Sequence, residues 1–177
     1  MKMTNQRGFS LIELLVVIVL IGIIGTISTQ VFILGFRSQG KSEILKEVKQ
    51  NGDYAMSVVE SFVRNASDIP RSSCNTNSNS FSIIAADGFT TTFVCSNAVI
   101  ASQSSGFPIP TPTITSPLTG SKVEVSSCTF RVVCPTPPLA PKYVFINFRI
   151  SQAGSGLPVD QTASLDYQST ISLRKYD

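Results

Sequence analysis

The stretch that decides the fold is Arg7-Gly8-Phe9-Ser10-Leu11-Ile12-Glu13-Leu14-Leu15, which leads into a run without charge from Leu14 to Phe36. At ~1.5 Å per residue that run gives ~34 Å of α-helix, and the hydrocarbon core of a bilayer is ~30 Å thick. The sequence therefore predicts a helix that can span a membrane. Glu13 lies just inside the apolar stretch, where a charged side chain costs ~2.5–3.5 kcal/mol. We therefore expect Glu13 to have a partner or a function.

The order of the segments around Gly8 differs from that of an ordinary secretory signal peptide. Such a signal carries its small-residue cleavage site after the apolar segment. Here Lys2 and Arg7 supply a basic N-terminal region, and Gly8, the small residue at the junction, precedes the apolar run. Cleavage after Gly8 would leave the hydrophobic segment on the mature chain, so we expect the membrane helix to be a working part of the protein.

The combination Gly8-Phe9-Ser10-Leu11-Ile12-Glu13 resembles the type IV prepilin signal, and the similarity covers about Met1 to Asn65. In type IV pilins and the pseudopilins of type II secretion, a membrane peptidase cuts after the glycine and methylates the new N-terminal phenylalanine. The resemblance implies cleavage between Gly8 and Phe9, N-methylation of Phe9, and assembly through Phe9 and Glu13. A simple N-terminal anchor with an incidental glutamate is the alternative interpretation.

The geometry of a helix start suggests how Glu13 could act in assembly. After cleavage the terminal amine of Phe9 lies on the helix axis, whereas the Glu13 side chain projects radially, so the two pair poorly within one chain. In subunits packed side by side, the amine of an incoming chain can instead meet Glu13 of its neighbour. This pairing would neutralise two charges in an apolar environment and set the register of assembly.

Residues 37–65 change from wholly apolar to amphipathic. Apolar residues recur there at three- and four-residue intervals, which is typical of a helix with one buried face. They are Ile44, Leu45, Val48, Ala55, Val58, Val59, Phe62 and Val63. Because no proline precedes Pro70, we expect one continuous helix from near Phe9 to about Asn65, with Gly40 and Gly52 as weak points.

The remainder of the chain predicts antiparallel strands. The expected strands are residues 81–86, 89–95, a short one at 99–100, 122–134, 142–151 and 165–174. Asp87-Gly88 is a two-residue hairpin signal between the first two. The proline-rich run 107–117 cannot be a central strand. In residues 142–151 the apolar side chains alternate, and we expect Val144, Ile146, Phe148 and Ile150 to face the helix.

These elements predict an α+β, pilin-like fold. A long N-terminal α-helix, with a membrane half and an amphipathic half, packs on a small antiparallel β-sheet head. The expected segments are a leader peptide at residues 1–8, a transmembrane and assembly helix at 9–36, an amphipathic helix at 37–66, and a disulfide-containing β head at 67–177.

The four cysteines all lie in the expected head, and an even number outside the cytoplasm favours disulfides. With Asp87-Gly88 as the turn, Cys95 lies opposite Ser80, within reach of Cys74. We therefore predict the pairs Cys74–Cys95 and Cys128–Cys134. The second pair requires a sharp turn within residues 129–133, because a straight strand would separate the two Cα atoms by ~20 Å. A zinc site is the alternative, although no C-x-x-C pair and no histidine is present.

Composition and motifs argue against several classes of function. The chain has no histidine, no Gly-x-Ser-x-Gly and no phosphate-binding glycine loop, so we expect no enzyme activity, cofactor or metal. The formal net charge of +3 includes Lys2 and Arg7 of the leader. Because Lys and Arg are not clustered, no nucleic-acid partner is indicated.

The resemblance implies a structural subunit, of the minor type, of a type IV pilus or a type II secretion pseudopilus. The expected location is the inner membrane, as a single-pass protein with its head outside the cytoplasm, and then the filament. Expected partners are prepilin peptidase, other pilin or pseudopilin subunits, the inner-membrane assembly machinery and the lipid bilayer. Two alternatives stay open: a filament-tip module that binds a surface, DNA or a secreted substrate, and a membrane anchor that does not assemble.

Overall fold

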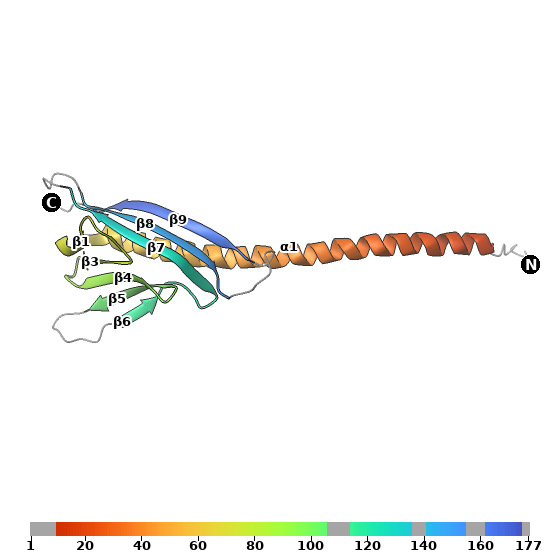
Figure 1. Ribbon diagram of the computed structural model, residues 1–177, viewed down its shortest axis with the longest axis horizontal. Helices are drawn as coiled ribbons and strands as arrows, with labels where there is room; N and C mark the ends of the chain where they lie inside the picture. Colours follow the sequence, from red (N-terminus) through yellow and green to blue (C-terminus); the bar gives the residue numbers. More distant parts are fainter. Residues whose placement is uncertain (1–9, 106–113, 136–140, 155–161, 175–177) are drawn as a thin grey trace, which may run out of the picture. The chain divides into compact units, whose positions relative to one another are not determined.

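The computed structural model describes residues 10–105, 114–135, 141–154 and 162–174. The chain divides into two compact units, residues 1–40 and residues 41–177. A single helix, α1 (Leu11–Asn65), contributes to both units and is 55 residues long (Figure 1). This confirms the expected long N-terminal helix, whose sequence contains no proline to interrupt its backbone hydrogen bonds.

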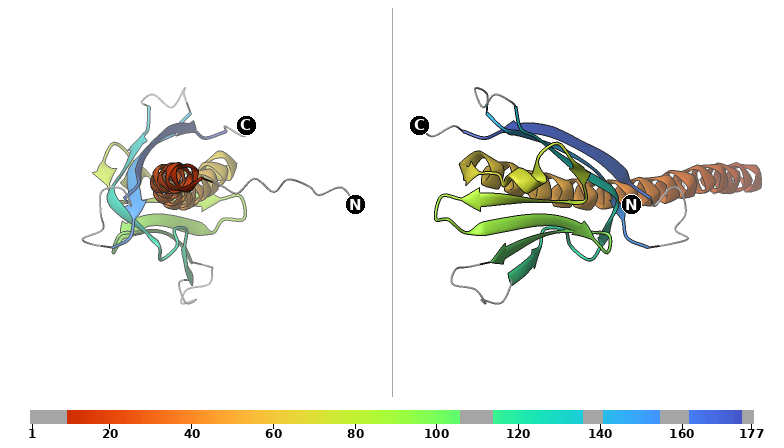
Figure 2. Two further views of the ribbon diagram at one scale, coloured as in Figure 1. Left: turned by 90° about the vertical axis from the view of Figure 1, so that its right-hand side faces the viewer. Right: turned by 60° about the vertical axis from the view of Figure 1, so that its left-hand side comes forward.

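Residues 41–177 form the head, in which strands make two antiparallel sheets rather than the single sheet that we expected (Figure 2). One sheet has the order β1-β3-β4-β5-β6 and the other has the order β2-β7-β8-β9. The first sheet contains β1 (Ala66–Asp68), β3 (Ser80–Ala85), β4 (Thr90–Ser96), β5 (Val99–Ser105) and β6 (Ile114–Pro117). The second contains β2 (Asn77–Ser78), β7 (Val123–Val133), β8 (Tyr143–Gln152) and β9 (Ser164–Ser172), and a short 3-10 helix, η1 (Arg71–Ser73), precedes β2.

The outer part of α1 buries one stripe against both sheets. Its buried residues are Val48, Gly52, Ala55, Val59 and Val63, which follow one another at intervals of three or four. Most of the predicted apolar face is therefore confirmed. Leu45 and Phe62 differ, because each lies on the flank of the stripe and is 43% exposed.

The helix-facing side of β8 is also confirmed. Val144, Ile146, Phe148 and Ile150 are buried in the common core. Their alternation with half-buried or exposed residues follows from the two-residue period of a strand.

The β3–β4 hairpin differs from its predicted register by one residue. Ser80 lies opposite Val94 rather than Cys95. The Ala85 N–H donates to the Phe89 carbonyl over 2.9 Å, which closes a three-residue loop. Of the predicted turn residues Asp87 and Gly88, only Gly88 has a positive φ, which is 84°. A type I turn followed by a left-handed glycine closes such a loop. The Asp87 side chain favours this turn, because it accepts a hydrogen bond from the Phe89 N–H.

The proline-rich run behaves as predicted where it is described. β6 (Ile114–Pro117) lies at the edge of the five-stranded sheet. At an edge, the missing N–H of a proline does not interrupt the hydrogen bonds between central strands. Residues 106–113 lie outside the described residues.

The predicted disulfide pairing is wrong. The structure joins Cys74 to Cys134, with a Cα–Cα distance of 5.6 Å, and Cys95 to Cys128, with a distance of 6.2 Å. β7 is one continuous strand through residues 129–133, so Cys128 and Cys134 cannot approach each other. Cys128 instead meets β4 of the other sheet.

Contacts with β7 also explain why Cys74 finds Cys134. Cys74 forms an isolated parallel bridge with Val132, and the Asn75 N–H donates to the Val132 carbonyl over 2.7 Å. These contacts hold the segment that follows η1 beside the C-terminal end of β7, where the chain continues into Cys134.

Candidate functional site

The candidate site is the apolar segment of α1 within residues 10–36. Its large hydrophobic side chains are all exposed, from 46% for Val17 to 82% for Leu11. An 18-residue window of α1 is apolar enough to cross a membrane, and 0% of that window is buried. A helix that packs on a soluble domain buries a stripe, whereas this segment presents apolar side chains all round. It therefore requires an apolar environment supplied by lipid or by other chains.

Two hydroxyl groups within the segment are satisfied by the helix itself. Thr26 Oγ1 donates to the Ile23 carbonyl over 2.8 Å, and Thr29 Oγ1 donates to the Gly25 carbonyl over 2.9 Å. An unsatisfied polar group in hydrocarbon costs several kcal/mol, so these local hydrogen bonds remove a barrier to insertion.

Glu13 lies in the first turn of α1 and is exposed. The Glu13 N–H donates to the Ser10 carbonyl over 3.0 Å, as does the Leu14 N–H over 3.2 Å, so the first turn is formed at Ser10. A carboxylate near a helix N-terminus is favoured by the partial positive charge of that end. Gly8 and Phe9, the predicted cleavage and methylation residues, lie outside the described residues.

One shallow depression on this segment was not singled out from the sequence. It has a volume of about 220 Å³ and is lined by Val31, Phe32, Gly35, Phe36 and Gln39. These residues share one helix face, and Gly35 leaves open space where a side chain would otherwise stand. The sequence feature that could have indicated this depression is a glycine, Gly35, between the two phenylalanines Phe32 and Phe36.

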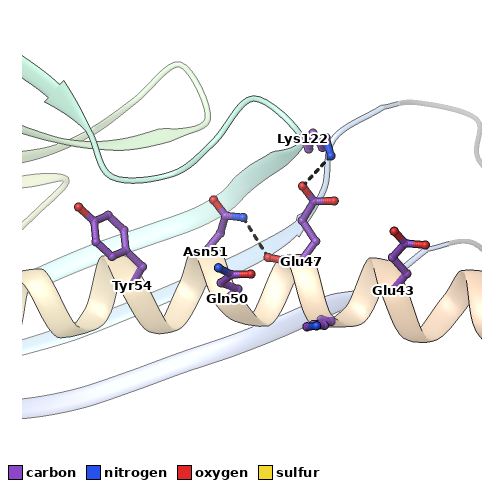
Figure 3. Close-up of a pocket in the computed structure, with 7 residues that line it drawn as sticks. Glu43, Glu47, Gln50, Asn51, Tyr54 and Lys122 are labelled. Carbon is purple, nitrogen blue, oxygen red and sulfur yellow. Dashed lines mark hydrogen bonds and ion pairs between the residues drawn. The ribbon is translucent and has the colours of Figure 1, made fainter.

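The head carries a second, polar groove of about 510 Å³ beside α1 (Figure 3). Its lining residues are Glu43, Lys46, Glu47, Gln50, Asn51, Tyr54 and Lys122. Lys122 Nζ lies 3.1 Å from Glu47 Oε1, and Asn51 accepts a hydrogen bond from the Gly120 N–H over 2.8 Å. Because the lysine side chain is 76% exposed, water screens this ion pair, which contributes ~0–1 kcal/mol.

The groove offers hydrogen bonds and charges of both signs to a neighbouring molecule. In the part of the chain that the structure describes, no group of three or more His, Cys, Asp or Glu side chains could hold a metal ion. From the sequence, residues 37–65 were predicted as an amphipathic helix and Lys122 as the start of a strand, and tertiary packing brings the two together at this groove.

Comparison with known proteins matches the N-terminal segment. The model of the prokaryotic N-terminal methylation motif matches residues 3–29, which include Gly8, Phe9 and Glu13. Searches of curated proteins and of solved structures found no match. The motif implies processing by prepilin peptidase, and the apolar helix that follows it is consistent with the inner membrane and then a pilus. The chain therefore carries, at residues 3–29, the prepilin-type N-terminal methylation motif that marks type IV pilins and pseudopilins.

Proposed function

We propose that this chain is a minor structural subunit of a type IV pilus or a type II secretion pseudopilus, assembled through its N-terminal helix. The observation that carries the proposal is the methylation motif at residues 3–29 together with an apolar helix segment of which nothing is buried. A leader cut at Gly8 leaves that segment on the mature chain. Its apolar surface then needs lipid before assembly and neighbouring helices after it.

The proposed route begins in the inner membrane. Prepilin peptidase removes residues 1–8 and methylates Phe9, residues 9–36 span the bilayer once, and the head stays outside the cytoplasm. The amphipathic helix at residues 37–66 packs on the disulfide-containing β head at residues 67–177. The inner-membrane assembly machinery then transfers the subunit to the filament. The family's members are typically structural rather than enzymatic, and we assign no reaction to this chain.

Glu13 is proposed to set the register of assembly. A carboxylate among exposed apolar residues is costly unless it finds a cation, and the methylated terminal amine of Phe9 in a neighbouring subunit is such a cation. Breaking a buried ion pair typically costs ~3–5 kcal/mol, so a misaligned subunit is penalised at both charges. In a subunit with the correct register, both the Glu13 carboxylate and the terminal amine are paired.

The minor role is supported by the proline-rich sequences at residues 107–117 and 135–141, whose composition resembles that of minor subunits. Quantitative mass spectrometry of sheared filaments tests this part of the proposal. A minor subunit would be present at a small fraction of the most abundant pilin, and equal or greater abundance would contradict the minor role without affecting the rest.

The assembly role of Glu13 is tested with Glu13→Ala in the native host. We expect membrane insertion and leader cleavage to persist, because the segment becomes more apolar and Gly8 is unchanged. The ratio of this chain in sheared filaments to that in membranes should fall at least about tenfold, which corresponds to ~1.4 kcal/mol of lost pairing. Glu13→Gln should behave alike, since it keeps the size of the side chain and removes the charge.

Gln30→Ala is the matched control, because Gln30 is an exposed, uncharged polar residue of the same segment. It should leave the filament-to-membrane ratio unchanged. An unchanged ratio for Glu13→Ala as well would contradict the role of Glu13 and would favour a membrane anchor that does not assemble.

A further inference from the structure

The edges of the two sheets differ in how they are protected. Edge strands of native proteins usually carry features that prevent pairing with another chain. β1 is three residues long with an irregular register, β2 is two residues long, and β6 is four residues long and ends at Pro117. β9 is nine residues long, contains no proline, and pairs with β8 without a register shift. β9 is thus an edge without these protections.

The ladder with β8 shows which backbone groups of β9 point to its free side. At one end the Leu173 N–H donates to the Lys142 carbonyl over 2.9 Å, and at the other the Gln152 N–H donates to the Ala163 carbonyl over 3.1 Å. Hydrogen-bonded and non-hydrogen-bonded pairs alternate in an antiparallel ladder, so the odd-numbered residues of β9 bond to β8. The backbone groups of the even-numbered residues point away from β8. These residues are Ser164, Asp166, Gln168, Thr170 and Ser172.

No described strand pairs with this free side, because β9 ends the order of its sheet. Figure 2 shows β9, in dark blue, as the outermost strand of that sheet. A row of alternating N–H and C=O groups can be matched over its whole length by another extended backbone. The ligand chemistry that fits this edge is therefore a peptide in β conformation.

The side chains next to the free edge indicate what kind of strand would fit. On the helix-facing side, Leu165 and Tyr167 are only partly buried, whereas their cross-strand partners Ile150 and Phe148 are 0% and 1% exposed. On the outer side, the charge of Asp166 is already paired with Arg149 through two hydrogen bonds of 2.6 and 2.8 Å. A complementary strand would alternate apolar residues toward the helix with uncharged polar residues outward.

β9 is also held in place before any partner arrives. Tyr167 Oη shares its one proton between the Lys49 carbonyl and Asp53 Oδ1, each 3.0 Å away, and Ser169 Oγ donates to Glu60 Oε1 over 2.6 Å. These contacts anchor β9 to α1 from the side opposite to the exposed face. A preformed edge lowers the entropy lost on binding.

We propose that the free edge of β9 is a docking site for an extended strand of another protein, which adds a fifth strand to the β2-β7-β8-β9 sheet. This site is separate from the N-terminal helix through which the subunit is proposed to assemble. It would allow the head to hold a second protein by backbone hydrogen bonds while α1 makes the filament contacts.

The test removes one backbone N–H that points away from β8 and keeps every hydrogen bond between β9 and β8. Gln168→Pro removes the outward N–H of an even-numbered residue, and Gln168→Ala is the matched control, because it removes the same side chain and keeps that N–H. A photoreactive benzoylphenylalanine at Thr170, whose side chain is exposed, reports the contact in the native host. We expect a cross-link to an extended segment of another protein, identified by sequencing the cross-linked peptide. Its yield should be kept in Gln168→Ala and reduced at least about tenfold in Gln168→Pro.

Hydrogen exchange of the full chain in detergent checks the fold of each variant. The amides of Tyr167, Ser169 and Ile171 should stay protected in Gln168→Pro, and those of Asp166 and Thr170 should exchange fast in the unaltered protein. If Gln168→Pro disrupts β9, Thr170→Pro with the photoreactive residue at Gln168 replaces it. Equal cross-link yields in the two variants, a cross-link only within this chain or to a second copy of it, or slow exchange at Asp166 and Thr170 would each overturn the proposal.

Discussion

At the scale of single residues, Gly52 has a role that helix propensity does not indicate. It was expected to be a weak point, but it is buried in the seam of α1 against the ring of Tyr167. That ring stacks on Phe148 with centroids 5.0 Å apart, and its hydroxyl is bonded to the Lys49 carbonyl. A methyl group at position 52 would overlap the end of the Tyr167 side chain, so glycine permits a close approach here.

Gly52→Ala should therefore destabilise the head. Overpacking of a buried site costs ~1–3 kcal/mol, and the better helix propensity of alanine returns ~1 kcal/mol or less. Gly40→Ala is the control, because a Cβ there has nothing within 4 Å and should be neutral or stabilising. Urea unfolding of the protein in detergent measures both. Equal stability of the two variants would contradict the packing role of Gly52.

The pKa of Tyr167 gives a second residue-scale prediction. Burial, followed by the hydrogen bond and negative charge of Asp53, raises this pKa from 10.0 to about 12. Because the folded state then binds its proton more tightly than the unfolded state, this contribution to stability is complete below pH 10. It is lost as the pH rises through about 12.

Tyrosinate absorbance during a pH titration checks this value. Subtracting the titration of Tyr167→Phe isolates the contribution of Tyr167, which should have its midpoint at about 12. Asp53→Asn should lower the midpoint, since it removes the negative charge. A difference curve with its midpoint at 10 would show that the buried, bonded geometry of Tyr167 is wrong.

At the scale of elements, β7 organises the head. It pairs with β2 and β8, its bonds to Asn75 hold the segment after η1, and Cys128 links it to the five-stranded sheet. The two sheets also meet through packed side chains such as Phe81 and Phe130, whose ring centroids are 4.9 Å apart, and through a hydrogen bond of 2.8 Å from the Val125 N–H of β7 to the Ala98 carbonyl. The Cys95–Cys128 disulfide is therefore a covalent tie between the sheets.

The connectivity predicts a definite set of linked peptides. Digestion with trypsin and an aspartate-specific protease cuts at Asp87, Lys122 and Arg131, which separates the four cysteines into four peptides. Without reduction, mass spectrometry should find Cys74 joined to Cys134 and Cys95 joined to Cys128. Linked peptides of any other pairing would contradict the described strand arrangement.

Replacing each pair by serine should cost stability. The closed loops span sequence separations of 60 and 33 residues, for which loss of a disulfide typically costs ~2–4 kcal/mol. Unfolding in urea of Cys95→Ser/Cys128→Ser and Cys74→Ser/Cys134→Ser measures both effects. Stabilities equal to that of the unaltered protein would show that the cross-links do not constrain the unfolded chain.

At the scale of the whole molecule, the chain is predicted to work in a shortened form. Intact mass measurement of protein from the native host should give a chain that begins at Phe9 and carries one added methyl group. Gly8→Arg should block the cut, because the motif needs a small residue at that position, whereas Gln6→Arg should not. Recovery of the unaltered protein with Lys2 still present, or with its N-terminus after Gly25, would contradict the proposed processing.

The local sequence by itself determined the long helix and the longer strands of this protein. The charge-free run to Phe36 requires a membrane-length helix, and the three- and four-residue spacing of Val48, Ala55, Val59 and Val63 selects the face that packs. Alternation along residues 142–151 likewise selects the buried face of a strand. Each of these depends on the period of a helix or strand, which neighbouring residues establish on their own. The methylation motif is also a contiguous sequence, and it located the candidate functional segment.

Only the tertiary structure decided how those elements combine. The single-residue shift of the β3–β4 hairpin, the division into two sheets and the Cys95–Cys128 link all depend on contacts between residues far apart in the chain. The free edge of β9 likewise follows from strand order. The close fit of Gly52 under Tyr167 brings together residues that lie far apart in the sequence of the head. Periodicity cannot predict these features, because the free energy that selects them comes from packing two sheets around one helix and from the loop closures that packing permits.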